Sequence, residues 1–178
     1  EILHINNPDL TEEEVISLVK QSDVCVYPTR TEGFGLTIAE AMFHKKPLIV
    51  TGYGAQMDFV DEDNSFVINY KLENTTDSEM VNLGAKWAEP DVEDLSSQMK
   101  EVLQIISNDN KDEILNSKFQ ILNSKVENAY ESVKDLTWEN SAKKTYEFIK
   151  RIEKVASLKN KKVAVMSFLN NQDGIAEY

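Results

Sequence analysis

The sequence has little of what several protein classes require. It holds one cysteine, Cys25, so no disulfide can form within the chain. The apolar run around this residue indicates a buried structural thiol in a reducing compartment. Only 6 glycines and 4 prolines accompany 41% apolar residues, which excludes a collagen-like or disordered chain. No apolar run approaches the roughly 18 residues of a membrane span. We therefore expect a cytoplasmic globular protein.

Basic residues are also scarce. The chain of 178 residues has 19 lysines and arginines against 31 aspartates and glutamates, for a net charge of −12. Such a surface repels phosphate backbones and anionic lipid headgroups, so nucleic acid and charged membranes are not expected partners. The chain begins with Glu1 rather than Met, and no signal-peptide pattern follows. We interpret it as a piece of a longer protein.

Helices and strands are predicted to alternate along the first half of the chain. Thr11 and Glu14 form a capping box, which predicts a helix start. A second helix is predicted over 36–45. Short apolar runs predict strands at 1–5, 23–27, 47–51 and 65–68. The runs at 23–27 and 47–51 are continuously apolar, which is typical of a parallel sheet that helices cover on both faces. The fold class is therefore predicted to be α/β with a doubly wound sheet.

The second half of the chain has a different pattern. Residues 69–90 are polar without a sustained period, and we predict a long loop or insertion. Three helices should follow, with Asp91 capping the first and Thr137 the third. Each has an apolar stripe that is expected to be core. The stripes are Val92, Leu95, Met99, Val102, Leu103 and Ile106; Leu115, Phe119, Leu122, Val126 and Val133; and Trp138, Ala142, Tyr146, Ile149 and Ile152.

The last twenty residues suggest a domain boundary. A basic spacer at 159–162 precedes a predicted strand over 163–169, a polar turn and the start of a helix. This order is how a new α/β domain begins. We therefore predict one domain over 1–158, and over 159–178 a linker with the opening strand and loop of a following domain.

The segment 28–42, PTRTEGFGLTIAEAM, has the chemistry of a ligand site. It follows a predicted strand, at the edge where parallel sheets bind ligands. Gly33 and Gly35 allow close backbone approach, and the helix that begins near Leu36 points amide groups at an anion such as phosphate. Glu40 lies about 6 Å further along that helix, where its carboxylate suits a ribose diol. Glu32 would face the other end of the ligand. The pattern indicates a sugar nucleotide, although two solvated glutamates are the alternative.

The stretch EGFGLTIAE, followed by AM and PLIVT, resembles the donor-binding signature of retaining glycosyltransferases with the GT-B fold, the group 1 or family 4 type. The resemblance implies the Rossmann-like C-terminal half of that fold. It also implies metal-independent, cofactor-free transfer of a sugar, with retention of configuration, from a UDP-sugar or GDP-sugar donor to a glycan or glycoconjugate acceptor. Polysaccharide biosynthesis is the expected role.

The resemblance also implies residue roles. Glu32 would be the catalytic residue that orients the donor sugar, and Glu40 would bind the ribose hydroxyls. The sugar and diphosphate would contact the residues between them, Gly33, Phe34, Gly35, Leu36 and Thr37.

Some features depart from the family pattern. Lys45 and Lys46 stand where the family commonly has glycine, which predicts a local backbone difference. Ala55 replaces the second of two glycines. The basic residues that neutralise the diphosphate and the N-terminal acceptor domain are absent. We expect the sheet to be incomplete at its N-terminal side, the isolated chain to be inactive, and its open edge to pair with residues 163–169 or a second copy.

Other interpretations remain open. The chain could be a non-catalytic scaffold or binding module of a larger protein, or an enzyme similar to sugar-nucleotide epimerases. Glu40 and His44 share a helix face, but no third ligand is evident, so no metal site is predicted. Arg30 and Lys71 could meet a phosphate, but they are better interpreted as solvated loop residues.

Overall fold

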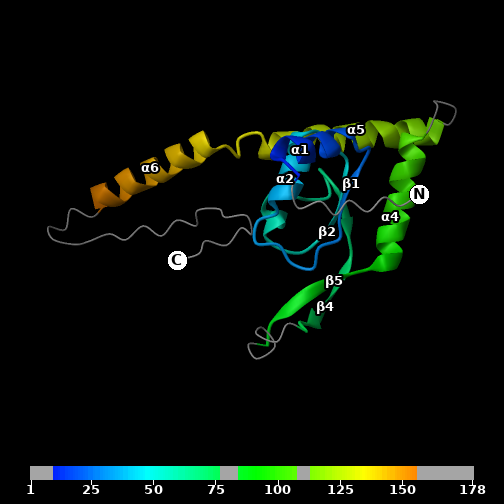
Figure 1. Cartoon of the computed structure of the whole chain (residues 1–178), viewed down its shortest axis with the longest axis horizontal. Coiled ribbons are helices and arrows are strands. Elements are labelled where there is room, and N and C mark those ends of the chain that lie inside the picture. Colours follow the sequence, from blue (N-terminus) through cyan, green and yellow to red (C-terminus); the bar gives the residue numbers. More distant parts are fainter. Residues whose placement is uncertain (1–9, 77–83, 108–112, 156–178) are drawn as a thin grey trace.

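The computed structural model describes residues 10–76, 84–107 and 113–155. Within them, three short strands form a parallel sheet in the order β1-β2-β3 (Figure 1). The strands are β1 (Cys25–Tyr27), β2 (Leu48–Thr51) and β3 (Phe66–Ile68). In the register, Val26 lies beside Ile49 and Val50 beside Val67. The predicted α/β fold with a parallel sheet is confirmed.

One helix precedes β1, and a second helix and a short 3-10 helix separate the three strands. They are α1 (Glu12–Gln21), α2 (Leu36–Phe43) and η1 (Ala55–Asp58). The predicted capping box at the start of α1 is present. The Thr11 amide donates to Glu14 Oε2 (2.8 Å), and the Glu14 amide donates to Thr11 Oγ1 (3.3 Å). Two of the four unsatisfied amides at this helix start are thereby paired.

Three longer helices follow, as predicted: α4 (Val92–Ile106), α5 (Glu113–Val133) and α6 (Trp138–Val155). Asp91 caps α4, because its carboxylate accepts from the Asp94 amide at 3.0 Å. Thr137 Oγ1 likewise accepts from the Asn140 amide at 3.2 Å, at the start of α6. These local hydrogen bonds account for where both helices begin.

Two apolar clusters cover the two faces of the parallel sheet. One contains strand residues Cys25, Leu48 and Val50 together with buried residues of α2 and the end of α5. The other contains Ile49 and Ile68 together with buried residues of α4 and the first half of α5. Neighbouring β2 residues thus point to opposite faces, as strand geometry requires. Cys25 is buried, as predicted.

Residues 69–90 correct the prediction of a long loop. They contain two strands, β4 (Tyr70–Asn74) and β5 (Lys86–Pro90), which pair in antiparallel fashion with Leu72 opposite Ala88. Every β4 residue is exposed, so no buried apolar pattern marks the strand in the sequence. Pairing of main-chain groups forms this ribbon instead. Figure 1 shows it projecting from the end of the sheet.

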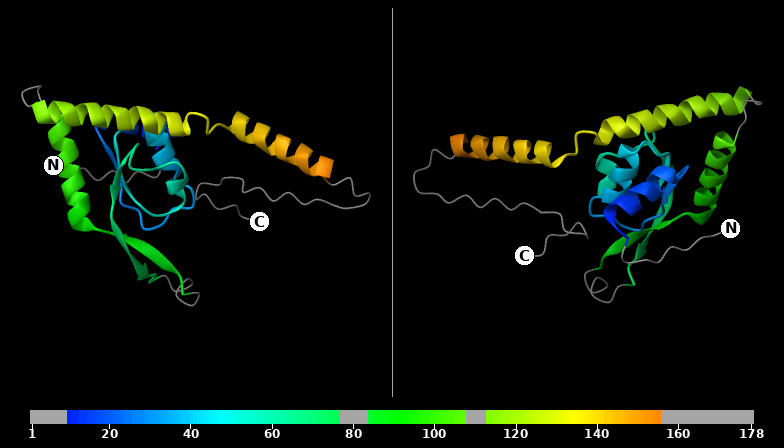
Figure 2. Two further views of the ribbon diagram at one scale, coloured as in Figure 1. Left: turned by 180° about the vertical axis from the view of Figure 1, so that it is seen from behind. Right: turned by 45° about the horizontal axis from the view of Figure 1, so that its top comes forward.

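Helix α6 corrects the prediction of a third core stripe. None of the α6 side chains that the structure describes is buried, and Trp138 and Tyr146 are 72% and 58% exposed. Figures 1 and 2 show α6 extending away from the sheet. The α4 stripe is correct only in part, since Val102 is buried but Val92 is 67% exposed.

The end of α2 corrects another expectation. A backbone difference was expected there because lysines replace the family's glycine. Lys45 itself adopts the left-handed conformation, with φ of 54°. Its Nζ pairs with Glu127 at 2.6 Å and lies 4.8 Å from the centre of the Tyr130 ring. These contacts with α5 help offset the steric cost of that conformation for a residue with a Cβ atom.

The predicted strand over 1–5 and the predicted elements over 159–178 lie outside the described residues. Among the helices that the structure describes, none combines the length and the apolar character that crossing a membrane requires.

Candidate functional site

The carboxyl ends of the three parallel strands meet at one edge of the sheet, and the segments that follow them touch. After β2, the Gly52 amide donates to the Ile68 carbonyl of β3 at 3.1 Å. The Ala55 amide donates to the Glu32 carbonyl in the segment after β1, at 3.2 Å. The predicted site residues therefore lie at the edge where α/β sheets bind ligands.

Helix α2 begins at this edge without a capping side chain. Gly35 is its N-cap residue, with φ of 89°. A Cβ atom on Gly35 would lie 3.0 Å from Gln56 Cβ and 3.2 Å from Ile38 Cδ1, so both conformation and space favour glycine. A Cβ atom on Gly33, in contrast, would meet nothing within 4 Å. The backbone there is open to close approach, and the α2 terminus has the partial positive charge that favours an anion.

One face of α2 is buried and the other is exposed to solvent. Ile38, Ala41 and Met42 are buried against the sheet, whereas Thr37 and Glu40 are exposed. The first turn is also tied to β1, because the Tyr27 hydroxyl donates to the Thr37 carbonyl at 3.0 Å. The structure thus places Glu40 on the solvent side of a firmly packed helix, one turn beyond Leu36.

Glu32 lies in the loop before α2, and its carboxylate is partly buried. Burial raises the pKa of this carboxyl above its usual range. Within the described residues, no hydrogen bond or ion pair to this carboxylate compensates for its burial. A partly desolvated carboxylate without a partner lowers stability, which is typical of groups that are kept for function.

A second glycine loop contributes to the site, and the sequence interpretation did not assign it a role. Gly54 has φ of 115°, and a Cβ atom there would lie 3.2 Å from the Glu32 amide nitrogen and 2.4 Å from Gln56 Oε1. The buried Gln56 Nε2 donates to the Thr51 carbonyl at 3.1 Å. The signal that could have indicated this loop is Gly52 and Gly54 flanking Tyr53 directly after a predicted strand.

Unpaired polar atoms gather near this edge. Among the described residues, three buried side-chain oxygens have no hydrogen-bond partner: Thr29 Oγ1, Thr51 Oγ1 and Gln56 Oε1. Thr29 lies in the loop after β1, Thr51 ends β2, and Gln56 lies in η1, which follows β2. Unpaired buried polar atoms are rare in native proteins, and functional sites are one place where they occur.

Arg30 is an exposed loop residue, as predicted, but its side chain has specific partners. Its guanidinium donates twice to Glu89 of β5, from Nε to Oε2 at 2.6 Å and from Nη2 to Oε1 at 3.0 Å. It also lies 4.7 Å from the centre of the Trp87 ring. Lys71 is exposed on β4.

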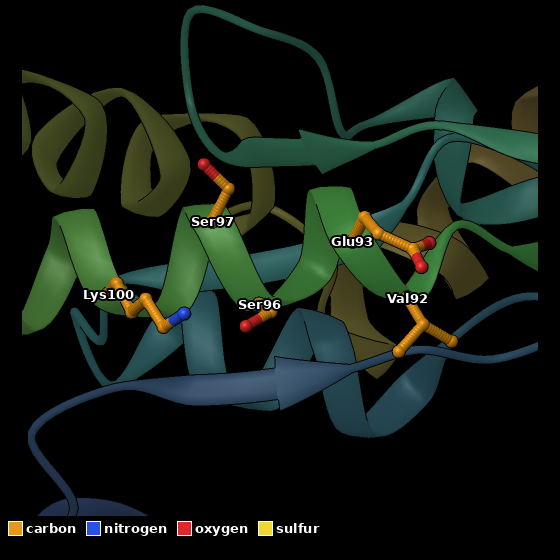
Figure 3. Close-up of a pocket in the computed structure, with 5 residues that line it drawn as sticks. All are labelled: Val92, Glu93, Ser96, Ser97 and Lys100. Carbon is orange, nitrogen blue, oxygen red and sulfur yellow. The ribbon is translucent and has the colours of Figure 1, made fainter.

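A metal site at Glu40 and a pocket on α4 are two other candidate functional sites, and neither has converging functional groups among the described residues. In the described part of the chain, no group of three metal-ligating side chains includes Glu40 and His44. Figure 3 shows a pocket whose lining residues all come from α4 and do not converge on one point: Val92, Glu93, Ser96, Ser97 and Lys100. None of them is a predicted site residue.

Comparisons with known proteins bear on the fold and the family of the chain. The chain matches the structure of sucrose-phosphate synthase from Thermosynechococcus elongatus with a TM-score of 0.53 and 18% sequence identity. The match covers 82% of this chain and 29% of that one, and at this identity it shows a shared fold. No curated protein shows significant similarity. The family model described as glycosyl transferases group 1 matches residues 7–104, more than half of the chain, which therefore belongs to that family.

Proposed function

We propose that the chain binds the sugar-nucleotide donor of a retaining, metal-independent glycosyltransferase. The observation that carries the proposal is the alignment of three features at one sheet edge: the partly buried Glu32, the uncapped start of α2 and the exposed Glu40. Family membership supports a glycosyltransferase. The donor, the acceptor and the stereochemistry belong to the proposal.

The arrangement suits a nucleoside diphosphate sugar. The diphosphate would bind at the amides of Leu36 and Thr37, where the α2 dipole is positive. The ribose would lie near Glu40, about 6 Å further along the helix axis. Gly33 and Phe34 would contact the sugar, because a Cβ atom at Gly33 would meet nothing and the Phe34 side chain is 37% exposed. The donor would be a UDP-sugar or a GDP-sugar.

In this proposal, catalysis depends on positioning and electrostatics. Glu32 would accept hydrogen bonds from the sugar hydroxyls and hold the ring in its reactive orientation. The α2 amides would stabilise the negative charge that develops on the leaving diphosphate. A hydroxyl of a glycan or glycoconjugate acceptor would attack from the face that the diphosphate leaves, which retains the configuration. Polysaccharide biosynthesis is the proposed setting.

A non-catalytic scaffold is the competing function. A scaffold would have no use for a carboxylate that is partly buried without a partner, and replacement of Glu32 by a neutral residue would stabilise it. The unpaired Glu32 therefore favours the donor site over the scaffold.

Saturation-transfer NMR with UDP, GDP, UDP-glucose and GDP-mannose tests the proposal. We expect signals at the ribose protons of one nucleotide series, and loss of those signals in Glu40→Ala. Glu147→Ala, which removes an exposed carboxylate on α6, is the control and should leave the signals unchanged. Equal signals in Glu40→Ala and the unaltered chain would contradict the proposed ribose contact.

A further inference from the structure

Strand β5 of the β4–β5 ribbon contacts the loop that carries Glu32. Arg30 lies two residues before Glu32, and its guanidinium donates two hydrogen bonds to the Glu89 carboxylate, from Nε at 2.6 Å and from Nη2 at 3.0 Å. Two parallel hydrogen bonds between a planar guanidinium and a carboxylate fix the orientation of both groups. The two partners are 59 residues apart in the sequence.

Trp87 and the main chain of β5 add two further contacts. Trp87 and Glu89 lie two residues apart on one face of β5, and the guanidinium lies over the Trp87 ring at 4.7 Å. Between them, the Ala88 amide donates to the Arg30 carbonyl at 2.9 Å. Three consecutive residues of β5 therefore hold both the side chain and the backbone of Arg30.

The segment after β2 contacts the same loop at Glu32. The Ala55 amide donates to the Glu32 carbonyl, and Gly54 packs closely enough that a Cβ atom would approach the Glu32 amide nitrogen to 3.2 Å. The loop between β1 and α2 has no regular secondary structure of its own. The contacts at Arg30 and at Glu32 therefore limit its conformations.

The charges around Arg30 support this arrangement. The pKa of the guanidinium is raised, first by its hydrogen bonds to Glu89 and then by the Glu89 charge, with a smaller contribution from Glu73 of β4. The pKa of the Glu89 carboxyl is lowered, with the hydrogen bonds from Arg30 as the largest cause. Both groups are therefore charged at neutral pH, as an ion pair requires.

We propose that Arg30 is a positioning residue and that β5, through Trp87, Ala88 and Glu89, clamps the loop so that Glu32 faces the donor sugar. This inference rests on the proposed donor site. Arg30 lies two residues from Glu32 and ten from Glu40, so the clamp acts on the sugar end of the ligand. Loss of the contacts between Arg30 and β5 therefore weakens binding of the sugar and leaves binding of the nucleotide unchanged.

The chain contains a matched control for this test. Lys45 pairs with Glu127 at 2.6 Å and lies over the Tyr130 ring at 4.8 Å, which repeats the combination of ion pair and ring contact. That cluster lies beyond the opposite end of α2 from Gly35, about 12 Å along the helix axis. Glu127→Gln therefore removes a similar interaction at a place that does not touch the loop.

The first measurement is amide hydrogen exchange of the full chain, which needs no ligand. Glu89→Gln and Arg30→Lys should speed exchange of the Ala88 and Ala55 amides, which donate to the Arg30 and Glu32 carbonyls of the loop, by about twofold to fivefold, as expected for the loss of an exposed ion pair. Exchange of the β2 amides should not change. Glu127→Gln should leave the Ala88 and Ala55 amides as they are. Equal exchange of these two amides in Glu89→Gln and Glu127→Gln would overturn the clamp.

The second measurement compares affinities for UDP-glucose with UDP and for GDP-mannose with GDP. Glu89→Gln should weaken binding of the sugar conjugate by about twofold to fivefold and leave the nucleotide affinity unchanged. Trp87→Phe retains an aromatic ring, so its affinity for the sugar conjugate should lie between those of Glu89→Gln and the unaltered chain. Equal losses for conjugate and nucleotide would show a general structural defect and overturn the positioning role. If the unaltered chain binds none of the four probes, the donor site fails, whereas the exchange measurement still decides whether β5 holds the loop.

Discussion

Glu32 is the residue at which stability and the proposed function oppose each other most directly. Its carboxylate is partly buried at the ligand edge of the sheet, and that burial raises its pKa. In the native state the group therefore releases its proton at a higher pH than in the unfolded chain. Above the native pKa the ionised carboxylate lowers the stability of the fold, and below the usual glutamate pKa this effect disappears.

Glu32→Gln should therefore stabilise the protein at neutral pH. We expect a rise in Tm of about 1–2 °C near pH 7 that becomes small near pH 3.5, where the carboxyl is mostly protonated in both states. Thermal unfolding at the two pH values measures this. Glu147→Gln controls for the general benefit of removing one negative charge from a chain with a net charge of −12. An equal rise in both variants would contradict a penalty specific to Glu32.

Gly35 and Gly33 provide a second comparison at the scale of the residue. Gly35→Ala places a Cβ atom 3.0 Å from Gln56 Cβ, on a backbone with φ of 89°. We expect it to lower the free energy of unfolding by about 1–3 kcal/mol in urea denaturation. Gly33→Ala adds a methyl group to open space, and its effect should be within about 0.5 kcal/mol. Similar losses for the two variants would contradict the tight packing of Gly35.

At the scale of the element, α1, α4 and α6 each begin where a single side chain accepts a hydrogen bond from an amide of the first turn. Asp91 shows this most clearly, since its carboxylate accepts from the Asp94 amide while its own amide donates to the Asn69 carbonyl at 2.8 Å. The residue therefore connects Asn69, between β3 and β4, with the start of α4. Its side chain and its backbone act on different neighbours.

Asp91→Ala should remove only the side-chain contribution. We expect a loss of about 1 kcal/mol in the free energy of unfolding, measured in urea. Asp91→Asn retains an oxygen that can cap the helix, so most of the stability should remain. A loss as large in Asp91→Asn as in Asp91→Ala would indicate that the negative charge near the α4 dipole matters more than the cap.

The elements also differ in how well the sequence predicts them. The runs at 23–27 and 47–51 are apolar because both faces of a parallel strand are buried, so β1 and β2 could be predicted. Lys71 and Glu73 give β4 no such run, and all of its residues are exposed. Strands formed by main-chain pairing at an edge leave little trace in composition.

At the scale of the whole molecule, α6 stands apart from the two apolar clusters. The structure describes no buried side chain in it, and Figures 1 and 2 show it directed away from the sheet. Its apolar stripe therefore contributes little to the stability of the part of the chain described. The last buried residue before it is Val133, at the end of α5.

A chain that ends after Leu136 should therefore unfold like the full chain. We expect the two Tm values to agree within about 2 °C, because no buried apolar area among the described residues is lost. Differential scanning calorimetry of both proteins provides the measurement. Removal of α5 from Lys125 onward is the destabilising control, since it takes away the buried Ala129 and Val133. A fall of more than about 4 °C after removal of α6 would show that its apolar stripe is packed.

The sequence by itself determined the features whose causes lie within a few residues. Continuous apolar runs indicated the parallel strands, the caps at Thr11, Asp91 and Thr137 marked helix starts, and the position of Glu32 after an apolar run placed it at the carboxyl edge of the sheet. Only the tertiary structure decided that β5 would hold Arg30, that Gly54 would pack against the Glu32 loop, and that α6 would be exposed. The reason is physical: periodicity and capping act locally, whereas these contacts depend on which distant surfaces meet when the sheet is assembled.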